Sequence, residues 1–206
     1  MMLPLPRRFY QRPATEVARD LLGKLLVHRT DLGLCMGRIV EVEAYLGRQD
    51  LAAHSSKGVT PRTQVMFGEA GHAYVYLIYG MHHCMNVVTG PAASGSAVLL
   101  RALEPVQGLE SNTSGPGRLT KAMGIDKSLY GADLCQPDSP LFLADDGYTP
   151  TSVLTSPRIG VHYAGAWADK PLRYYVEGSA WVSRVPKPRV KNKNFSQSPA
   201  QVSNSV

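Results

Sequence analysis

The segment that decides the fold is residues 73–103, AYVYLIYGMHHCMNVVTGPAASGSAVLLRAL. It holds three segments of strand length that are rich in β-branched and aromatic residues, at 73–79, 83–89 and 97–103. Glycine-containing turns separate each segment from the next. Connections this short join antiparallel strands, because a parallel pair needs a long crossover. The segment therefore predicts three neighbouring strands of an antiparallel sheet.

The pattern continues on both sides of this segment. Residues 36–46, MGRIVEVEAYL, alternate in character, which places Glu41, Glu43 and Tyr45 on one face of a strand. Strands outnumber helices, and neither a GxGxxG nor a GxxxxGK[ST] motif is present. We therefore expect a mixed α/β (α+β) domain with a largely antiparallel sheet and flanking helices, not a doubly wound fold. Further strands are predicted at 141–144, 152–155, 158–163 and 172–176, and helices at 14–26 and 117–123.

Composition and charge indicate one domain followed by a tail. The 206 residues are 44% hydrophobic and 18% charged, which is typical of a globular chain. The net charge is +6, but the basic residues between 184 and 193 carry most of it, because no acidic residue follows Glu177. We expect a domain at 1–183 and a basic, flexible tail at 184–206, which serves either as a solubilising segment or as a phosphate tether.

The cysteines and the apolar segments indicate the compartment. Cys35, Cys84 and Cys135 are far apart and form no CxxC pair, so we expect neither a zinc ribbon nor a disulfide scaffold. No apolar run is long enough to span a membrane, and the first residues do not read as a secretory signal. We expect an intracellular protein without membrane contact.

Polar and aromatic residues gather in a few neighbouring segments. Two carboxylates on one strand face, Glu41 and Glu43, indicate either a solvated edge or a general base beside the aromatic ring of Tyr45. Tyr76 either packs in the sheet or stacks on a planar ligand. His54 by itself is weak evidence, because a loop histidine is more often merely exposed.

The next segments contain a histidine pair that could suggest a metal site and two polar side chains, Asn86 and Arg101, each with two possible roles. His82 and His83 are adjacent on a strand and point to opposite faces, so no metal site is expected. Asn86 can read a base edge or can bond the backbone. Arg101 lies in an apolar run and needs a partner, either a carboxylate such as Glu43 or a phosphate.

Taken together, these segments resemble the alkyladenine (3-methyladenine) DNA glycosylase family over about residues 10–183. The resemblance lies in blocks that occur in order and with compatible spacing. They are RIVEVEAYLG (38–47), AH (53–54), TPR (60–62), VMF (65–67), YVYLIYGM (74–81), CMN (84–86), VLLRALEP (98–105), GPGRL (115–119), GAW (165–167) and KPLR (170–173).

The resemblance implies a reaction and the residues that perform it. Glu43 corresponds to the general base that activates water for attack on the sugar carbon of a flipped nucleotide. Arg101 corresponds to a residue that helps to hold this carboxylate and water, and the carbonyl near Val161 completes the water shell. No cofactor is implied. A single compact domain with a curved sheet and a protruding β-hairpin is implied as well.

The resemblance also implies how the damaged base is held. Tyr45, His54 and Tyr76 correspond to the walls and hydrogen-bonding edge of a purine pocket, and Asn86 to the residue that excludes normal guanine. Tyr79 corresponds to the side chain that fills the gap left by the flipped base. Such aromatic residues suit the task, because an enzyme cannot reach a base inside a duplex until it is extruded.

We therefore expect a monofunctional, monomeric enzyme that excises alkylated or deaminated purines (3-methyladenine, 7-methylguanine, hypoxanthine) from duplex DNA, starting base excision repair. The alternatives are a non-catalytic module that binds damaged or single-stranded nucleic acid, and a hydrolase of free purine nucleosides. The sequence departs from the family at 55–59, which is less basic than expected, at Thr63 in place of asparagine, and at His162 in place of a small residue.

Overall fold

The longest strand, β2 (Gly33–Leu46), organises the sheet, because three strands pair with it. On one of its edges β1 (Leu25–Thr30) pairs with the first half and β8 (Arg173–Val176) with the second half. On the other edge β5 (Ser96–Gln107) runs along almost its whole length. The strand therefore connects the two ends of the chain to the middle.

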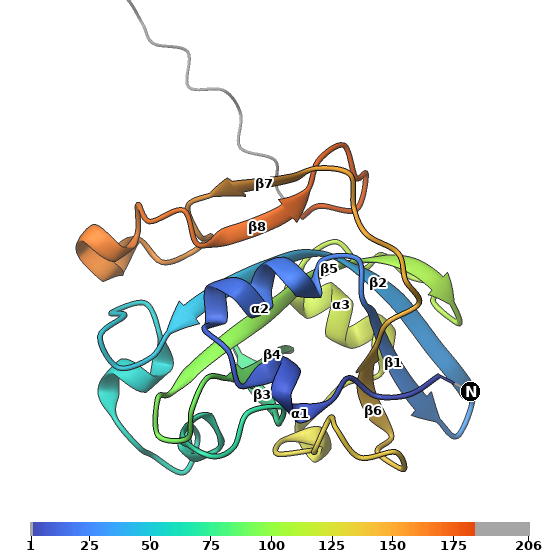
Figure 1. The fold of residues 1–206 in the computed structure, drawn as a ribbon, viewed down its shortest axis with the longest axis horizontal. Helices are drawn as coiled ribbons and strands as arrows, with labels where there is room; N and C mark the ends of the chain where they lie inside the picture. The colour runs from blue at the N-terminus through green and yellow to red at the C-terminus, as the bar shows by residue number, and fades with distance from the viewer. Residues whose placement is uncertain (1, 184–206) are drawn as a thin grey trace, which may run out of the picture.

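The structure, a computed structural model, describes residues 2–183. All pairings between its strands are antiparallel, in the order β3-β4-β5-β2-β1-β6, with β8 joined to β2 and β7 to β8. Figure 1 shows the β7–β8 pair above the rest of the curled sheet. The remaining strands are β3 (Ala73–Ile78), β4 (His82–Thr89), β6 (Leu141–Ala144) and β7 (Val153–Ser156).

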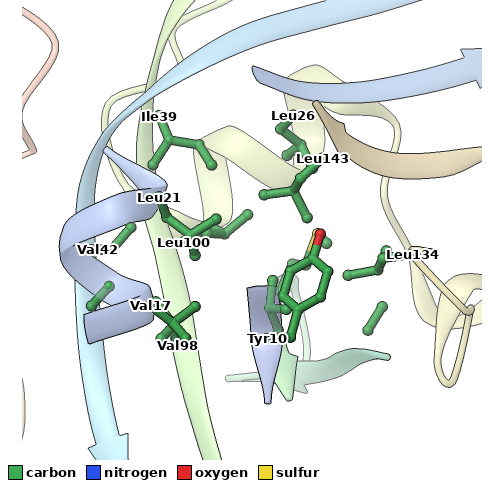
Figure 2. Close-up of a cluster of buried hydrophobic side chains, with 14 of the residues drawn as sticks. Tyr10, Val17, Leu21, Leu26, Ile39, Val42, Val98, Leu100, Leu134 and Leu143 are labelled. Carbon is green, nitrogen blue, oxygen red and sulfur yellow. The ribbon is translucent and has the colours of Figure 1, made fainter. Parts of the chain in front are cut away.

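Short helices cover the sheet and close the core. The α-helices are α1 (Arg7–Tyr10), α2 (Ala14–Leu21) and α3 (Pro116–Met123). Figure 2 shows side chains from α1, α2, β1, β2, β5 and β6 meeting around the buried ring of Tyr10. The 3₁₀ helices are η1 (His54–Lys57), η2 (Gln64–Phe67), η3 (Lys127–Leu129) and η4 (His162–Trp167). The fold class predicted from the sequence is confirmed.

Alternation along β2 and β5 separates the core from the opposite face of the sheet. Val42, Ala44, Val98 and Leu100 belong to the hydrophobic core. The residues between them therefore point away from it, and Glu43 is one of these. The interior of the curl provides packing, and the other face of these strands is free to carry polar groups.

Two irregularities interrupt the β2–β5 ladder beside Glu41. The register passes from Ile39↔Leu103 to Glu41↔Ala102 and then to Val42↔Leu100, which leaves Val40 and Arg101 without a partner in the ladder. A bulge of this kind bends its strand and redirects the side chain of the extra residue. Alternation from Val98 and Leu100 places Arg101 on the face opposite the core, and the irregularity beside it returns Leu103 to the core.

The β3–β4 hairpin carries an aromatic residue at its tip. Its turn contains Tyr79 at φ 52° and Gly80 at φ 68°, two consecutive positive values as in a type I′ turn. This conformation suits glycine but is uncommon for tyrosine. The Tyr79 side chain is 84% exposed and the neighbouring Met81 74% exposed, so the tip presents apolar surface to the outside.

Two expectations about the elements are wrong. The helix predicted at 14–26 ends at Leu21, because Gly23 turns the chain at φ 91° and Leu25 begins β1. The strand predicted at 158–163 is a loop that leads into η4. In both cases an apolar run fitted more than one regular structure, and tertiary contacts decided between them.

Residues 184–206, the predicted tail, lie outside the described residues. Within the described part of the chain, no helix has the length and apolar character needed to cross a membrane.

Candidate active site

A cleft of about 640 Å³ lies on the face of the sheet opposite the core. This volume is in the range of pockets that enclose a small organic ligand. The cleft brings together residues from the strands β2, β3, β4 and β5, the hairpin tip, the start of α3 and the loops and 3₁₀ helices around them. Every site residue proposed from the sequence lines it, namely Glu43, Tyr45, His54, Tyr76, Tyr79, Asn86, Arg101 and Val161.

Glu43 is the carboxylate that lines this cleft. Glu43 is 0% exposed, so the alternative of a solvated edge is wrong for this residue. The Tyr45 hydroxyl donates to Oε2 at 2.8 Å, and the Ile159 backbone N–H donates to Oε1 at 2.8 Å. Nη1 of Arg101 lies 3.3 Å from Oε1. Because all three groups interact favourably with a negative charge, they orient an ionised carboxylate.

Tyr45 is suited to donate this hydrogen bond. Burial raises its pKa well above the ordinary value, and the neighbouring Glu43 carboxylate raises it further. The phenol therefore keeps its proton and donates to the carboxylate. The face of the Tyr45 ring packs against the Arg158 guanidinium, whose Cζ lies 4.6 Å from the ring centroid.

Glu41 is the second carboxylate of the strand, and it does not line the cleft. It is 0% exposed, and its Oε1 accepts from Nε of Arg101 at 2.9 Å and from Nε of Arg173 at 2.7 Å. The Ser183 N–H donates to Oε2 at 2.6 Å and the Ser183 hydroxyl to Oε1 at 2.9 Å. Arg101 was expected to need a carboxylate such as Glu43. It contacts both carboxylates, and its shorter contact is with Glu41.

The charge of Glu41 is well stabilised. Burial alone would raise its pKa, but Arg101, Arg173 and the Ser183 N–H outweigh burial and lower the pKa below its ordinary value. Burial opposes the charge of Arg101, yet the two carboxylates raise its pKa. Glu41 and Arg101 therefore remain charged together at neutral pH.

Aromatic rings form one wall of the cleft. The ring of His54 meets that of Tyr76 edge-on at 4.7 Å, and the Tyr74 and Tyr76 rings lie 5.2 Å apart at 33°. Burial raises the pKa of Tyr74 to about 12, so its phenol stays protonated at neutral pH. These rings offer a flat apolar surface of the kind on which a purine stacks.

Asn86, from β4, and Val161, from the loop before η4, both line the cleft. Asn86 is 4% exposed, and its Nδ2 donates to the Tyr74 carbonyl at 3.2 Å, which is the backbone role that the sequence left open. Its side chain lines the cleft as well. The Val161 carbonyl accepts from the Ala164 N–H at 3.0 Å.

Several lining residues carried no signal that identified them in the sequence. Tyr74 lies in the same sequence block as Tyr76 but was assigned no role, and its hydroxyl lies 2.8 Å from Nδ1 of His54. Ile159 contributes a backbone N–H, which no side-chain pattern reveals. Ser183 ends the described chain in the wall of the cleft, where Nη2 of Arg101 reaches its hydroxyl at 3.2 Å.

The departures from the family pattern lie away from Glu43. Thr63 is 4% exposed, and its hydroxyl closes its own loop by donating to the Gly58 carbonyl at 2.9 Å. His162 is exposed on η4 and is not among the residues that line the cleft.

The comparison with known families decides what kind of site this is. The family described as methylpurine-DNA glycosylase (MPG) matches residues 8–180, most of the chain. The chain belongs to this family. It is therefore a DNA glycosylase of the 3-methyladenine type, which hydrolyses the N-glycosidic bond between a purine and its sugar. The alternatives of a non-catalytic module and of a hydrolase of free nucleosides are set aside.

Curated relatives of this glycosylase agree over nearly their full length. A protein of Legionella pneumophila (strain Lens) named "Putative 3-methyladenine DNA glycosylase" is 56% identical over 89% of this chain and 100% of its own. Proteins of the same name occur in Myxococcus xanthus (54% identical, 89% of this chain, 95% of the relative) and in Methanocella arvoryzae (49%, 87% and 96%).

His54 of the glycosylase is held in its neutral form. Burial, with smaller contributions from Arg62 and Lys57, lowers its pKa from 6.5 to about 4. A neutral ring does not repel a cationic methylated purine.

This shift makes the stability of the glycosylase depend on pH. Because the unfolded chain binds the proton near pH 6.5 and the folded chain near pH 4, stability is lost as pH falls through this window. We expect His54 to account for a loss of about 2 kcal/mol between pH 7 and pH 4.5. Urea denaturation at both pH values measures the loss, and His54→Asn serves as the control. Equal losses in the two proteins contradict the prediction.

Proposed function

We propose that the chain is a monofunctional glycosylase that flips an alkylated or deaminated purine out of duplex DNA and releases it by hydrolysis. The substrate class comprises 3-methyladenine, 7-methylguanine and hypoxanthine. The observation that carries the proposal is the Glu43 carboxylate, held by Tyr45, Ile159 and Arg101 in a cleft with an aromatic wall and room for a flipped nucleotide.

Glu43 acts as the general base in this proposal. The N-glycosidic bond breaks through a state in which positive charge develops on the sugar. A carboxylate at this place removes a proton from the attacking water and stabilises that charge. The three groups that hold Glu43 keep one oxygen directed at a fixed point of the cleft, which favours attack from one direction.

The β3–β4 hairpin supports flipping. Tyr79 lines the cleft and is exposed at the hairpin tip, in a backbone conformation that tyrosine rarely adopts. Uncommon conformations of this kind concentrate at functional sites. An exposed ring beside the pocket fills the space of the extruded base and so lowers the cost of opening the stack.

The histidine of the pocket offers a donor to the departing base. In this proposal the Tyr74 hydroxyl donates to Nδ1 of His54 at 2.8 Å, which leaves the proton of the neutral ring on Nε2. Cationic methylpurines leave without such help, whereas neutral hypoxanthine benefits from a donor.

Direct hydrolysis is favoured over a lyase reaction. Among residues 2–183, the cleft is lined by no lysine that could form a Schiff base with the sugar. We further propose that residues 1–183 form the catalytic domain, that the basic segment 184–206 is not needed for the chemical step, and that the enzyme acts as a monomer on the DNA of the cell.

The experiment incubates the full chain with duplexes that each contain one lesion and scores abasic sites by strand cleavage in alkali. Hypoxanthine and 7-methylguanine duplexes are expected to be cut and an undamaged duplex to stay intact. The same lesions in single strands and as free nucleosides test the duplex requirement. Failure of the folded protein to release any lesion would falsify the proposed substrate class.

A further inference from the structure

A buried ion pair lies behind the cleft without lining it. The side chains of Asp50 and Arg158 are both 0% exposed. The guanidinium makes a bidentate contact with the carboxylate, called a fork below: Nη1 donates to Oδ2 at 2.6 Å and Nη2 donates to Oδ1 at 2.9 Å. A two-pronged contact of this kind fixes both distance and orientation.

Asp50 also organises the chain around it. Its Oδ2 accepts from the Leu46 N–H at 3.0 Å and its Oδ1 from the Ala52 N–H at 3.1 Å. The first bond holds the end of β2, just after Tyr45. The second holds the loop that leads to His54. One carboxylate therefore connects the strand that carries Glu43 with the loop that carries the pocket histidine.

Arg158 connects this ion pair with two further parts of the chain. Its Nη1 donates to the Ala44 carbonyl at 2.9 Å and its Nη2 to the Trp167 carbonyl at 3.3 Å. The next residue in the chain, Ile159, donates its N–H to Oε1 of Glu43 at 2.8 Å. The position of this N–H therefore depends on the anchoring of Arg158.

The net stability of the fold is a weak explanation for such a pair. The cost of removing both charges from water is close to the energy gained by pairing, and apolar replacements of buried pairs are often no less stable. An apolar pair cannot make these directed hydrogen bonds, which fix the positions of two loops and a strand relative to one another.

We propose that Asp50 and Arg158 are positioning residues for the reaction. They orient Glu43 through the Ile159 N–H, and they hold Tyr45 from behind. Neither side chain touches the substrate. This inference rests on the proposed function, because it takes Glu43 as the group that activates water.

The test uses the double variant Asp50→Asn/Arg158→Gln, which removes both charges and leaves none unpaired. We expect the single-turnover rate of base release to fall about 10- to 100-fold, because small misplacements of a reacting group have effects of this size. Lesion binding is expected to stay within about fivefold, because the stacking surfaces remain.

A second fork of the same kind provides the matched control. Arg38 holds Asp146 at 3.0 and 2.8 Å, donates to the Gly23 carbonyl at 2.8 Å and lies 4.3 Å from the Tyr148 ring, away from the cleft. Arg38→Gln/Asp146→Asn is expected to keep the wild-type rate and lesion affinity.

The outcomes separate the possibilities. A folded Asp50→Asn/Arg158→Gln protein with the wild-type rate overturns the inference, as does a loss of rate that is matched by an equal loss of lesion binding or by the control double variant. If this double variant does not fold, Arg158→Lys is measured instead. It keeps the charge but lacks the two-pronged contact, so a wild-type rate overturns the inference there. If the wild-type chain releases no base at all, the proposed function itself has failed.

Discussion

Replacing Glu43 with glutamine is expected to slow base release from a lesion-containing duplex by about a thousand-fold, the scale of losing a general base. Lesion binding is expected to survive, because the aromatic wall and the hairpin tip are unchanged. The amide also fits the local geometry. Its oxygen can still accept from the Ile159 N–H, and its NH₂ group can donate to the Tyr45 hydroxyl.

Single-turnover excision and an equilibrium binding measurement on the same duplex separate these two effects. Glu104→Gln is the matched control, because Glu104 is an exposed glutamate on the neighbouring strand β5, outside the cleft. Undiminished turnover in Glu43→Gln would remove Glu43 from the mechanism. Loss of both binding and turnover would show that the side chain holds the pocket together instead.

Replacing Glu41 with glutamine is expected to destabilise the fold by about 3 kcal/mol, the lower end of the cost of breaking a buried ion pair. Its Oε1 faces donors from Arg101, Arg173 and Ser183, and its Oε2 faces the Ser183 N–H. Every group around the carboxylate is a donor, so the NH₂ group of glutamine must face another donor. The positive charge of the two arginines also loses a partner.

Urea denaturation at neutral pH measures this change. Glu43→Gln, two residues along the same strand, is expected to lose only about 1 kcal/mol, because its amide can satisfy both near neighbours. The double variant Glu41→Gln/Arg173→Gln is expected to regain part of the loss, since the buried charge is again balanced. A Glu41→Gln protein as stable as the wild type contradicts this view of the cluster.

The two carboxylates show how far the sequence could be interpreted. Alternation along β2 was sufficient to place Glu41, Glu43 and Tyr45 on one face, because the side chains of a strand alternate by local geometry. Nothing in that pattern distinguishes a solvated face from a sealed one. The structure places Glu41 behind Arg101 and Glu43 in the cleft, because strands and loops from elsewhere in the chain cover them.

Arg101 shows a second limit. The sequence indicated that an arginine in an apolar run needs a partner, and this is confirmed by its contacts with Glu41 and Glu43. Its place beside both carboxylates depends on the pairing register of β5 with β2, which no local pattern on β5 reveals. The wrong strand at 158–163 has a similar origin. The segment is irregular because Arg158 bonds Asp50, 108 positions earlier in the chain.

The sequence by itself determined the antiparallel strands and the hairpin with a tyrosine at its tip, and its family resemblance pointed to several of the side chains that line the cleft. These features follow from the two-residue period of a strand and from motifs that are contiguous in the chain. Only the tertiary structure decided which carboxylate faces the cleft, which backbone N–H reaches it, and how Asp50 and Arg158 hold the loops together. The physical reason is that a buried charge must find its partners in three dimensions, and here those partners lie 60 to 142 positions apart in the chain.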